Sequence, residues 1–260
     1  MALLDVKKLT KNFGGLTAVS DVTLELNEGE LVGLIGPNGA GKTTLFNLLT
    51  GVYEPSEGTV TLDGHLLNGK QPYKIATLGL SRTFQNIRLF KDLTVLDNVL
   101  IAFGNHHKPH VLASFFRLPA FYKNEEELKA KALELLAIFD LDKEAETLAK
   151  NLAYGQQRRL EIVRALATEP KILFLDEPAA GMNPQETAEL TALIRRIKNE
   201  FNITIMLIEH DMSLVMEVTE RIYVLEYGRL IAHGTPDEIK NDKRVIEAYL
   251  GGEANVDAQS

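Results

Sequence analysis

A glycine-rich segment of eight residues constrains this chain more than any other part of its sequence. Residues 36–43 read Gly-Pro-Asn-Gly-Ala-Gly-Lys-Thr, which fits the pattern Gly, four residues, Gly, Lys, Ser/Thr. We expect an apolar strand before it, over 30–35, and a helix after it, over 44–50, that ends at Gly51. Strand, loop and helix in this order form a cradle for nucleotide phosphates.

The residue types of this loop indicate what each position does. Glycines let the backbone approach the phosphates closely, with its N–H groups facing the negative charge. Lys42 would reach the terminal phosphates of a nucleoside triphosphate, and the hydroxyl of Thr43 would help to hold Mg²⁺. The predicted nucleotide-binding residues here are Gly36, Pro37, Asn38, Gly39, Ala40, Gly41, Lys42, Thr43 and Thr44.

Bulk properties exclude several classes of protein. The 260 residues suffice for one large α/β domain, or for a core with a smaller subdomain, and the absence of cysteine excludes disulfides and Cys-ligated zinc. A net charge of −8 argues against a protein whose main function is to bind nucleic acid. The N-terminus shows no secretory signal, and apolar stretches such as 203–208 are too short to span a bilayer. Any membrane role is therefore expected to come through a partner.

Periodicity predicts a β-rich N-terminal part, a helical middle and a βαβ unit. The expected strands are 3–9 and 21–26 with a turn over 11–15, 59–62 before the turn Asp63-Gly64, 171–176, 203–209, and the hairpin 221–225 and 229–233. The expected helices are 125–139, 156–168, 184–200 between two parallel strands, and one that begins at Thr235-Pro236-Asp237-Glu238. We expect a polar tail without regular structure over 251–260.

Two carboxylates follow the apolar strand that ends at Asp176. At the carboxyl end of a parallel sheet, Asp176 is well placed to organise Mg²⁺. Glu177, the next residue, is a candidate general base for an attacking water. Acidic residues at the end of a strand often only contact solvent, so these two acids alone are weak evidence of a functional site. Together with the phosphate loop they are strong evidence.

With both motifs in place, the chain resembles the ATP-binding-cassette ATPases over nearly its whole length. The resemblance implies an α/β fold: a P-loop NTPase core with a RecA-like parallel sheet, an antiparallel β-subdomain and an inserted helical signature subdomain. It implies one domain over 1–250, with the nucleotide-binding core and β-subdomain in 1–84 and 170–235, the helical subdomain in 85–169 and a C-terminal helix in 236–250.

The same resemblance implies roles for residues outside the two motifs. Phe13 stands where the family stacks an aromatic ring on adenine, and Gln85 matches the loop glutamine that touches Mg²⁺ or water. His210 matches the switch histidine that contacts the γ-phosphate. The implied catalytic residues are Glu177, His210 and Gln85, and the implied metal-binding residues are Thr43, Gln85 and Asp176. The signature segment, Leu152, Ala153, Tyr154, Gly155 and Gln156, would face nucleotide bound on a partner subunit.

Three positions depart from the family pattern. Ala153 replaces the serine of Leu-Ser-Gly-Gly-Gln and lacks its hydroxyl, and Tyr154 replaces a glycine and crowds the same loop. Asn183 stands where the family usually has Asp. Contacts across a dimer are expected to be weaker at Asn183, and Ala153 leaves a non-catalytic ATP-binding module open for one of the two sites.

The exact residues of these motifs indicate a particular subfamily. Arg82-Thr83-Phe84-Gln85, Leu152-Ala153-Tyr154-Gly155-Gln156-Gln157-Arg158-Arg159 and Glu177-Pro178-Ala179-Ala180-Gly181-Met182-Asn183-Pro184 are similar to one ATPase subunit of bacterial branched-chain amino acid importers. This implies that the chain hydrolyses ATP with Mg²⁺. It also implies four partners: two membrane permeases, a second ATPase that forms a heterodimer with this chain, and an external binding protein. It places the subunit on the cytoplasmic face of the cell membrane. The alternatives are an exporter ATPase for lipid or drug, and an ATPase of the same superfamily that acts on DNA or ribosomes.

Two further segments carry weaker signals. His106, His107 and His110 suggest a metal site, but Pro109 breaks the helix that would align them, so we predict none. The aromatic stretch 115–122 is expected to form helical-subdomain core rather than a groove for a permease helix.

Overall fold

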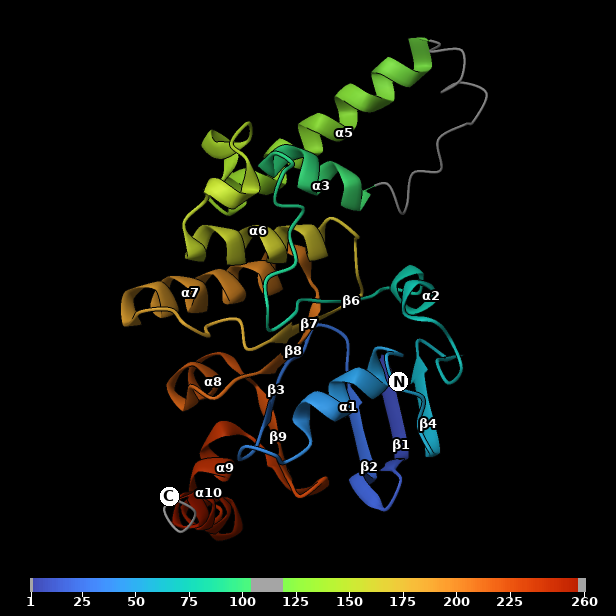
Figure 1. The fold of residues 1–260 in the computed structure, drawn as a ribbon, viewed down its shortest axis with the longest axis vertical. Helices are drawn as coiled ribbons and strands as arrows, with labels where there is room; N and C mark the ends of the chain where they lie inside the picture. The colour runs from blue at the N-terminus through green and yellow to red at the C-terminus, as the bar shows by residue number, and fades with distance from the viewer. Residues whose placement is uncertain (1, 104–118, 257–260) are drawn as a thin grey trace.

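The computed structural model describes residues 2–103 and 119–256, which form two β-sheets with helices around them (Figure 1). The strands are β1 (Leu4–Phe13), β2 (Leu16–Leu26), β3 (Leu31–Ile35), β4 (Glu57–Leu62), β5 (His65–Leu66), β6 (Leu80–Arg82), β7 (Ile172–Asp176), β8 (Thr204–Ile208), β9 (Arg221–Glu226) and β10 (Arg229–Gly234). The helices are α1 (Lys42–Leu49), α2 (Pro72–Thr77), α3 (Val95–Phe103), α5 (Pro119–Ile138), α6 (Tyr154–Leu166), α7 (Pro184–Phe201), α8 (Met212–Val218), α9 (Pro236–Asn241) and α10 (Lys243–Val256), with short 3-10 helices at Asp142–Glu144 and Ala149–Asn151. The expected α/β class is confirmed.

The central sheet has the strand order β10-β9-β3-β8-β7-β6 and is parallel except for β10. Every residue of β3, β7 and β8 is buried, because both faces of the sheet are covered. Alternate residues of β7 belong to two cores. Leu173 and Leu175 pack towards α3, α5, α6 and α7, whereas Ile172 and Phe174 pack towards α1 and the antiparallel sheet. The Phe174 ring stacks on Phe46 of α1 with centroids 4.6 Å apart.

Strand register aligns the loops that follow the parallel strands. Asp176 pairs with Ile208, Ile208 pairs with Leu34, and Arg82 pairs with Phe174. The carboxyl ends of β6, β7, β8 and β3 therefore lie along one edge of the sheet, where ligands bind in open α/β folds. This edge carries the candidate site.

The second sheet is antiparallel, with the order β2-β1-β4-β5. We predicted a turn over 11–15, but β1 continues to Phe13 and only Gly14 and Gly15 separate it from β2. Lys11 and Asn12 stay in the ladder, paired with Val19 and Thr17, and the Thr17 hydroxyl donates to the Asn12 side chain at 2.8 Å. The predicted turn at Asp63-Gly64 is confirmed, with φ values of 48° and 75°.

The middle of the chain is helical, as expected, and lies on one side of the central sheet (Figure 1). Helix α5 begins at Pro119 rather than near 125, and α6 begins at Tyr154 rather than at 156. Buried residues of α3, α5, α6 and α7 share one hydrophobic core with the sheet. Among the described residues, no helix combines the length and apolar character needed to cross a bilayer.

The C-terminal part differs from our expectation of a single helix over 236–250 and an irregular tail. The Thr235 cap is present, since its hydroxyl accepts from the N–H of Glu238, but α9 ends at Asn241. Asp242 is extended, and its carboxylate accepts from the N–H of Arg244, so it starts a second helix as an N-cap does. Helix α10 then continues to Val256. Val245 packs this helix against a hydrophobic core, and in a helix that has already formed its first turn each further residue adds one backbone hydrogen bond.

Candidate nucleotide and catalytic site

The glycine-rich loop joins β3 to α1 and lies against two other segments of the chain. A Cβ at Gly36 would lie 2.0 Å from the carbonyl oxygen of Leu225, and one at Gly41 would lie 2.6 Å from that of Ala18. Gly41 also has a φ of 99°, which other residues rarely adopt. Both positions therefore require glycine, because neighbouring backbone leaves no room for a side chain.

The other loop residues differ in exposure. Ala40 is buried, and its carbonyl accepts from the N–H of Gly228 at 2.8 Å, which ties the loop to the β9–β10 turn. Asn38, Gly39 and Thr43 are exposed, while Pro37 and Thr44 are half-buried. Thr43, whose hydroxyl is predicted to hold Mg²⁺, is thus an exposed residue in the first turn of α1.

Lys42 lies inside the loop at the first position of α1. Its Nζ donates to the carbonyl oxygens of Gly36 at 2.6 Å and Pro37 at 3.0 Å, and the residue is 6% exposed. Burial lowers the pKa of Lys42, while the charges of Glu177 and Asp176 act to raise it. The ammonium group therefore lies close enough to both carboxylates to sense their charge, so the loop and the two acids belong to one site.

Asp176 ends β7 and is buried, with 3% exposure. Its backbone N–H donates to the hydroxyl of Thr83 at 3.2 Å, and its carboxylate lies 3.8 Å from the guanidinium of Arg82. Burial raises the pKa of Asp176, although Arg82 acts to lower it. A buried carboxylate at the edge of the sheet where ligands bind is suited to bind a further cation.

Glu177 brings the three predicted catalytic residues together. Its carboxylate accepts from the side-chain amide of Gln85 at 2.9 Å, and its other oxygen lies 2.8 Å from Nε2 of His210. The backbone at Glu177 has a φ of 47°, and its N–H donates to the carbonyl of Ile208 at 2.9 Å. This turn directs the carboxylate between the loops that follow β6 and β8. Its partners can hold it in one orientation, as a general base requires.

The signature segment, residues 152–156, leads into α6, which begins at Tyr154 and lies apart from α1 in Figure 1. The side chain of Gln156 accepts from the N–H of Ala153 at 3.1 Å, but Ala153 has no hydroxyl to return a bond. Half of a capping box is therefore present. Leu152 is buried, Ala153 is exposed and Gly155 is half-buried.

The two remaining departures from the family pattern have local partners. The hydroxyl of Tyr154 donates to the carbonyl of Ala180 at 3.0 Å. Asn183 caps α7, because its side chain accepts from the N–H of Glu186 at 3.0 Å and the Glu186 carboxylate accepts from the Asn183 N–H at 2.9 Å. Both side chains thus shape the segment that follows Glu177.

Phe13 lies at the tip of the β1–β2 hairpin and is 42% exposed. It pairs with Leu16, two residues before Ala18, whose carbonyl lies against the phosphate loop. Its ring and that of Tyr53 form a T-shaped pair with centroids 5.3 Å apart, and the Lys11 ammonium lies 5.1 Å from the centre of the Phe13 ring. A partly exposed ring beside the loop is a suitable surface for a purine base.

Among the described residues, three buried charged ones had no role predicted from the sequence: Arg158, Glu161 and Glu209. Glu209 is 4% exposed, and its carboxylate accepts from the backbone N–H groups of Ala179 at 2.7 Å and His210 at 3.0 Å. Arg158 is fully buried in α6 and donates to the backbone of the Gln85 loop. A carboxylate directly after an apolar strand was a signal for Glu209, whereas Arg158 looks like any helical surface arginine.

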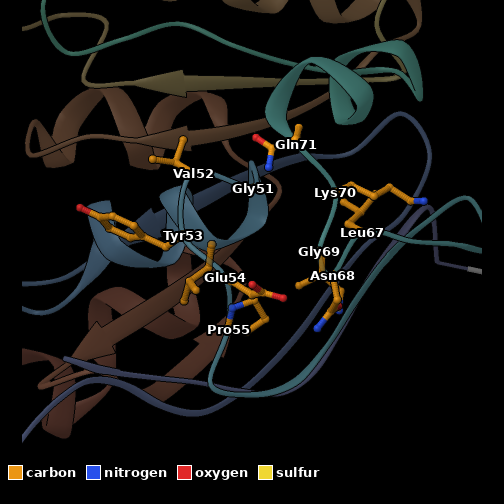
Figure 2. A pocket seen from close by; sticks show the side chains of 12 residues that line it. Gly51, Val52, Tyr53, Glu54, Pro55, Leu67, Asn68, Gly69, Lys70 and Gln71 are labelled. Carbon is orange, nitrogen blue, oxygen red and sulfur yellow. The ribbon is translucent and has the colours of Figure 1, made fainter. Parts of the chain in front are cut away.

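A pocket of about 240 Å³ lies at the far end of α1 from the phosphate loop (Figure 2). The segment after α1, with Val52, Tyr53 and Pro55, forms one wall, and the segment before α2, with Asn68 and Gln71, forms the other. Because the candidate phosphate-binding groups lie at the opposite end of α1, this pocket is not part of the site. The His106, His107 and His110 prediction lies outside the described residues.

Comparisons with known proteins agree with this geometry. The model of the family described as ABC transporter matches residues 19–180, and that described as branched-chain amino acid ATP-binding cassette transporter matches residues 229–255. The chain is 50% identical over 249 residues to the high-affinity branched-chain amino acid transport ATP-binding protein BraF of Pseudomonas aeruginosa, covering 96% of this chain and 98% of that one. It is also 50% identical over 249 residues to LivG of Escherichia coli, with the same coverage.

Solved structures give the same result. A nucleotide-free ATP-binding cassette from an ABC transporter matches with a TM-score of 0.82 and 34% identity over 96% of this chain and 99% of that one. The ADP conformation of a transporter cassette matches with a TM-score of 0.82 and 32% identity over the same shares. ATP hydrolysis is general among transport ATPases of this kind. The phosphate loop, the buried strand-end acids and these matches together show that the chain belongs to the ATP-binding-cassette transporter family, as a nucleotide-binding ATPase component of a transport system.

Proposed function

We propose that this chain is the ATP-hydrolysing subunit that energises uptake of branched-chain amino acids through a membrane permease complex. The structural observation that carries the ATPase part is the Glu177 carboxylate held between Gln85 and His210 beside the phosphate loop. The cargo assignment is supported by relatives named for branched-chain amino acid transport and by the match of β10 to α10 to that family's C-terminal model. These matches favour an importer over an exporter and over an ATPase that acts on DNA or ribosomes.

The residues at the sheet edge fit ATP with Mg²⁺. Thr43 and Asp176 offer oxygen ligands, as does the side chain of Gln85, and Mg²⁺ prefers oxygen and completes its shell from phosphates and water. Among residues 2–103 and 119–256, no group of three or more His, Cys, Asp or Glu side chains is arranged to hold a metal ion. Bound Mg²⁺ would neutralise charge on the β- and γ-phosphates.

Each catalytic residue then has a defined task. Lys42 leaves the carbonyls of Gly36 and Pro37 for phosphate oxygens, which offer it a full negative charge. Glu177 accepts a proton from the attacking water, and Gln85 and His210 orient its two oxygens. Phe13 stacks on the base.

A second ATPase subunit completes each site in this proposal. We propose that the signature segment acts on nucleotide held by a partner, because it leads into α6, apart from α1 and the phosphate loop of its own chain. A dimeric ATP-binding cassette bound to ADP and Pi matches with a TM-score of 0.75 and 26% identity, over 90% of this chain and 98% of that one. We propose a heterodimer, because Ala153 makes this chain's signature segment differ from the usual one.

A groove of about 830 Å³ is the proposed binding site for the permease. It lies between α2, α3, α6 and the loop after β6, beside the residues that carry Gln85. Exposed Tyr73, Phe90 and Ile101 give it an apolar lining, and it also contains Arg82 and Arg88. We propose that each of two permeases inserts a short amphipathic helix with a carboxylate into such a groove, which holds this subunit at the cytoplasmic face of the membrane. An external binding protein would deliver the amino acid.

Uptake of labelled leucine at low external concentration tests this function. Cells without the gene for this chain should lose high-affinity uptake of leucine, isoleucine and valine, and cells with Glu177→Gln should match them although the complex assembles. Proline uptake serves as the control and should not change. Purification of the tagged chain from its native membrane should recover two permeases and a second ATPase. Unchanged leucine uptake in the deletion strain, with no second copy present, would remove the cargo assignment and leave only the ATPase.

A further inference from the structure

Tyr154 makes a contact that the family's glycine at this position cannot make. Its hydroxyl donates to the carbonyl of Ala180 at 3.0 Å, across 26 residues of sequence. Its ring also covers Gly181, where an added Cβ would lie 3.6 Å from the nearest ring atom. The signature segment is thereby joined to the segment that follows Glu177 within one chain.

Arg158 extends this contact to the Gln85 loop. One nitrogen of its guanidinium donates both to the Tyr154 hydroxyl at 3.3 Å and to the carbonyl of Gln85 at 2.9 Å. The side chain is fully buried, and Glu161 at 2.9 Å balances its charge. A buried, multiply bonded guanidinium has little freedom to move, so it holds Tyr154 and the Gln85 backbone in a constant relation.

These contacts form a closed circuit that begins and ends at Glu177. The Gln85 side chain donates to the Glu177 carboxylate, the Gln85 carbonyl accepts from Arg158, and Arg158 donates to Tyr154. Tyr154 donates to Ala180, whose backbone N–H returns to the carbonyl of Glu177 at 3.1 Å. Both the side chain and the backbone of Glu177 are therefore linked to the first turn of α6.

We propose that Tyr154 is a positioning residue that couples the signature segment of this chain to the general base of the same chain. The proposal rests on the proposed dimer, in which the signature segment touches the partner's nucleotide while Glu177 acts on this chain's own nucleotide. A shift of α6 upon contact with the partner's γ-phosphate would pull on Ala180 and on the Gln85 backbone together. Occupancy of one site would thus set the orientation of the base in the other.

Tyr154→Phe is the decisive change, because it keeps the ring over Gly181 and removes only the hydroxyl. In the assembled complex we expect the kcat of ATP hydrolysis to fall about three- to tenfold, the size of one net hydrogen bond, with the KM for ATP unchanged. Tyr223→Phe is the matched control, since it removes a hydroxyl that also donates to a carbonyl, that of Glu25 at 3.1 Å, from strand β9, which β3 and β8 separate from β7. The control should keep its kcat. Equal loss in both variants, or no loss in Tyr154→Phe, would overturn the proposal.

Amide hydrogen exchange in the full-length isolated chain gives a second readout that does not depend on cargo or permease. Tyr154→Phe should speed exchange in peptides that cover 177–183 at least about threefold, because Ala180 loses its anchor, and Tyr223→Phe should not. Unchanged exchange in this segment would show that the hydroxyl does not hold it. A complex that fails to transport leucine, yet shows both effects of Tyr154→Phe, would refute the proposed function and leave this coupling standing.

Discussion

Nε2 of His210 lies 2.8 Å from Oε1 of Glu177, although 33 residues separate them in sequence. The contact follows from the parallel pairing of β7 and β8, in which Asp176 lies opposite Ile208. Glu177 follows the first strand and donates its N–H to Ile208 at the end of the second, while His210 comes two residues later. The sheet edge thus presents the proposed base already oriented.

Lys42→Ala should weaken ATP binding about a hundredfold or more. The substitution removes the ammonium that would bond charged phosphate oxygens, and each such bond contributes about 1.5–3 kcal/mol. Equilibrium binding of a fluorescent ATP analogue to the purified chain measures this. Lys70→Ala removes a surface ammonium near the far end of α1 and serves as the control. Wild-type affinity in Lys42→Ala would remove the phosphate-binding assignment.

Glu177→Gln should keep ATP affinity and lower turnover about 10²–10⁴-fold, because the phosphate cradle survives while the acceptor for the water proton is lost. ATP hydrolysis and nucleotide retention in the assembled complex check this, and a closed, ATP-bound dimer should accumulate. Glu217→Gln on the exposed side of α8 should hydrolyse ATP normally. Near wild-type turnover of Glu177→Gln would mean that another group takes the proton.

Ala153→Ser should stabilise the chain by about 1 kcal/mol, because its hydroxyl would accept from the first turn of α6 and complete the capping box that Gln156 half forms. Urea unfolding of the isolated chain measures this gain. In the complex, the same hydroxyl should change turnover at the partner's site and leave ATP affinity at the Lys42 site unaltered. Site-resolved nucleotide trapping that showed a change only at the Lys42 site would contradict the head-to-tail arrangement.

Phe13→Ala should weaken ATP binding by about 1–3 kcal/mol, the range found for stacking of a base on an aromatic side chain. Leu16→Ala is the matched control, since Leu16 pairs with Phe13 and is 67% exposed at the same hairpin. Titration with ATP and with tripolyphosphate separates the base from the phosphates, because only ATP should lose affinity. Equal losses for both ligands would place the effect in the phosphate loop instead.

Glu209→Gln should change how stability depends on pH. Burial raises the pKa of Glu209 above its ordinary 4.5, so its charged form is less favourable in the folded than in the unfolded chain. The protonated Glu209 carboxyl therefore contributes stability that is fully present below about pH 4.5 and is lost as the pH rises through the pKa of the folded protein. The Gln variant does not titrate at this position, so it does not lose this contribution. Urea unfolding of both proteins between pH 4 and 8 should show that the free energy of unfolding of the variant increases relative to that of the wild type as the pH rises. Parallel curves would exclude Glu209 as the source.

Local patterns in the sequence predict the phosphate loop and the two acids of the candidate site, whereas Gln85, His210 and Phe13 were implied by the family resemblance. The glycine-rich loop, the two acids after the strand that ends at Asp176 and the Thr235 cap each depend on neighbours within a few residues, so they are readable without a fold. The family, the α/β class and the ATPase activity followed from these motifs and are confirmed by the comparisons.

Only the tertiary structure decided which distant side chains meet. The burial of Arg158, the bonds of Glu209 to two loops and the reach of Tyr154 to Ala180 depend on the packing of α6 and on strand register, which no local pattern encodes. Sequence thus determined which chemical groups are available, and the relative placement of the helices and the central sheet determined which of them act together, because their contacts join residues far apart in the chain.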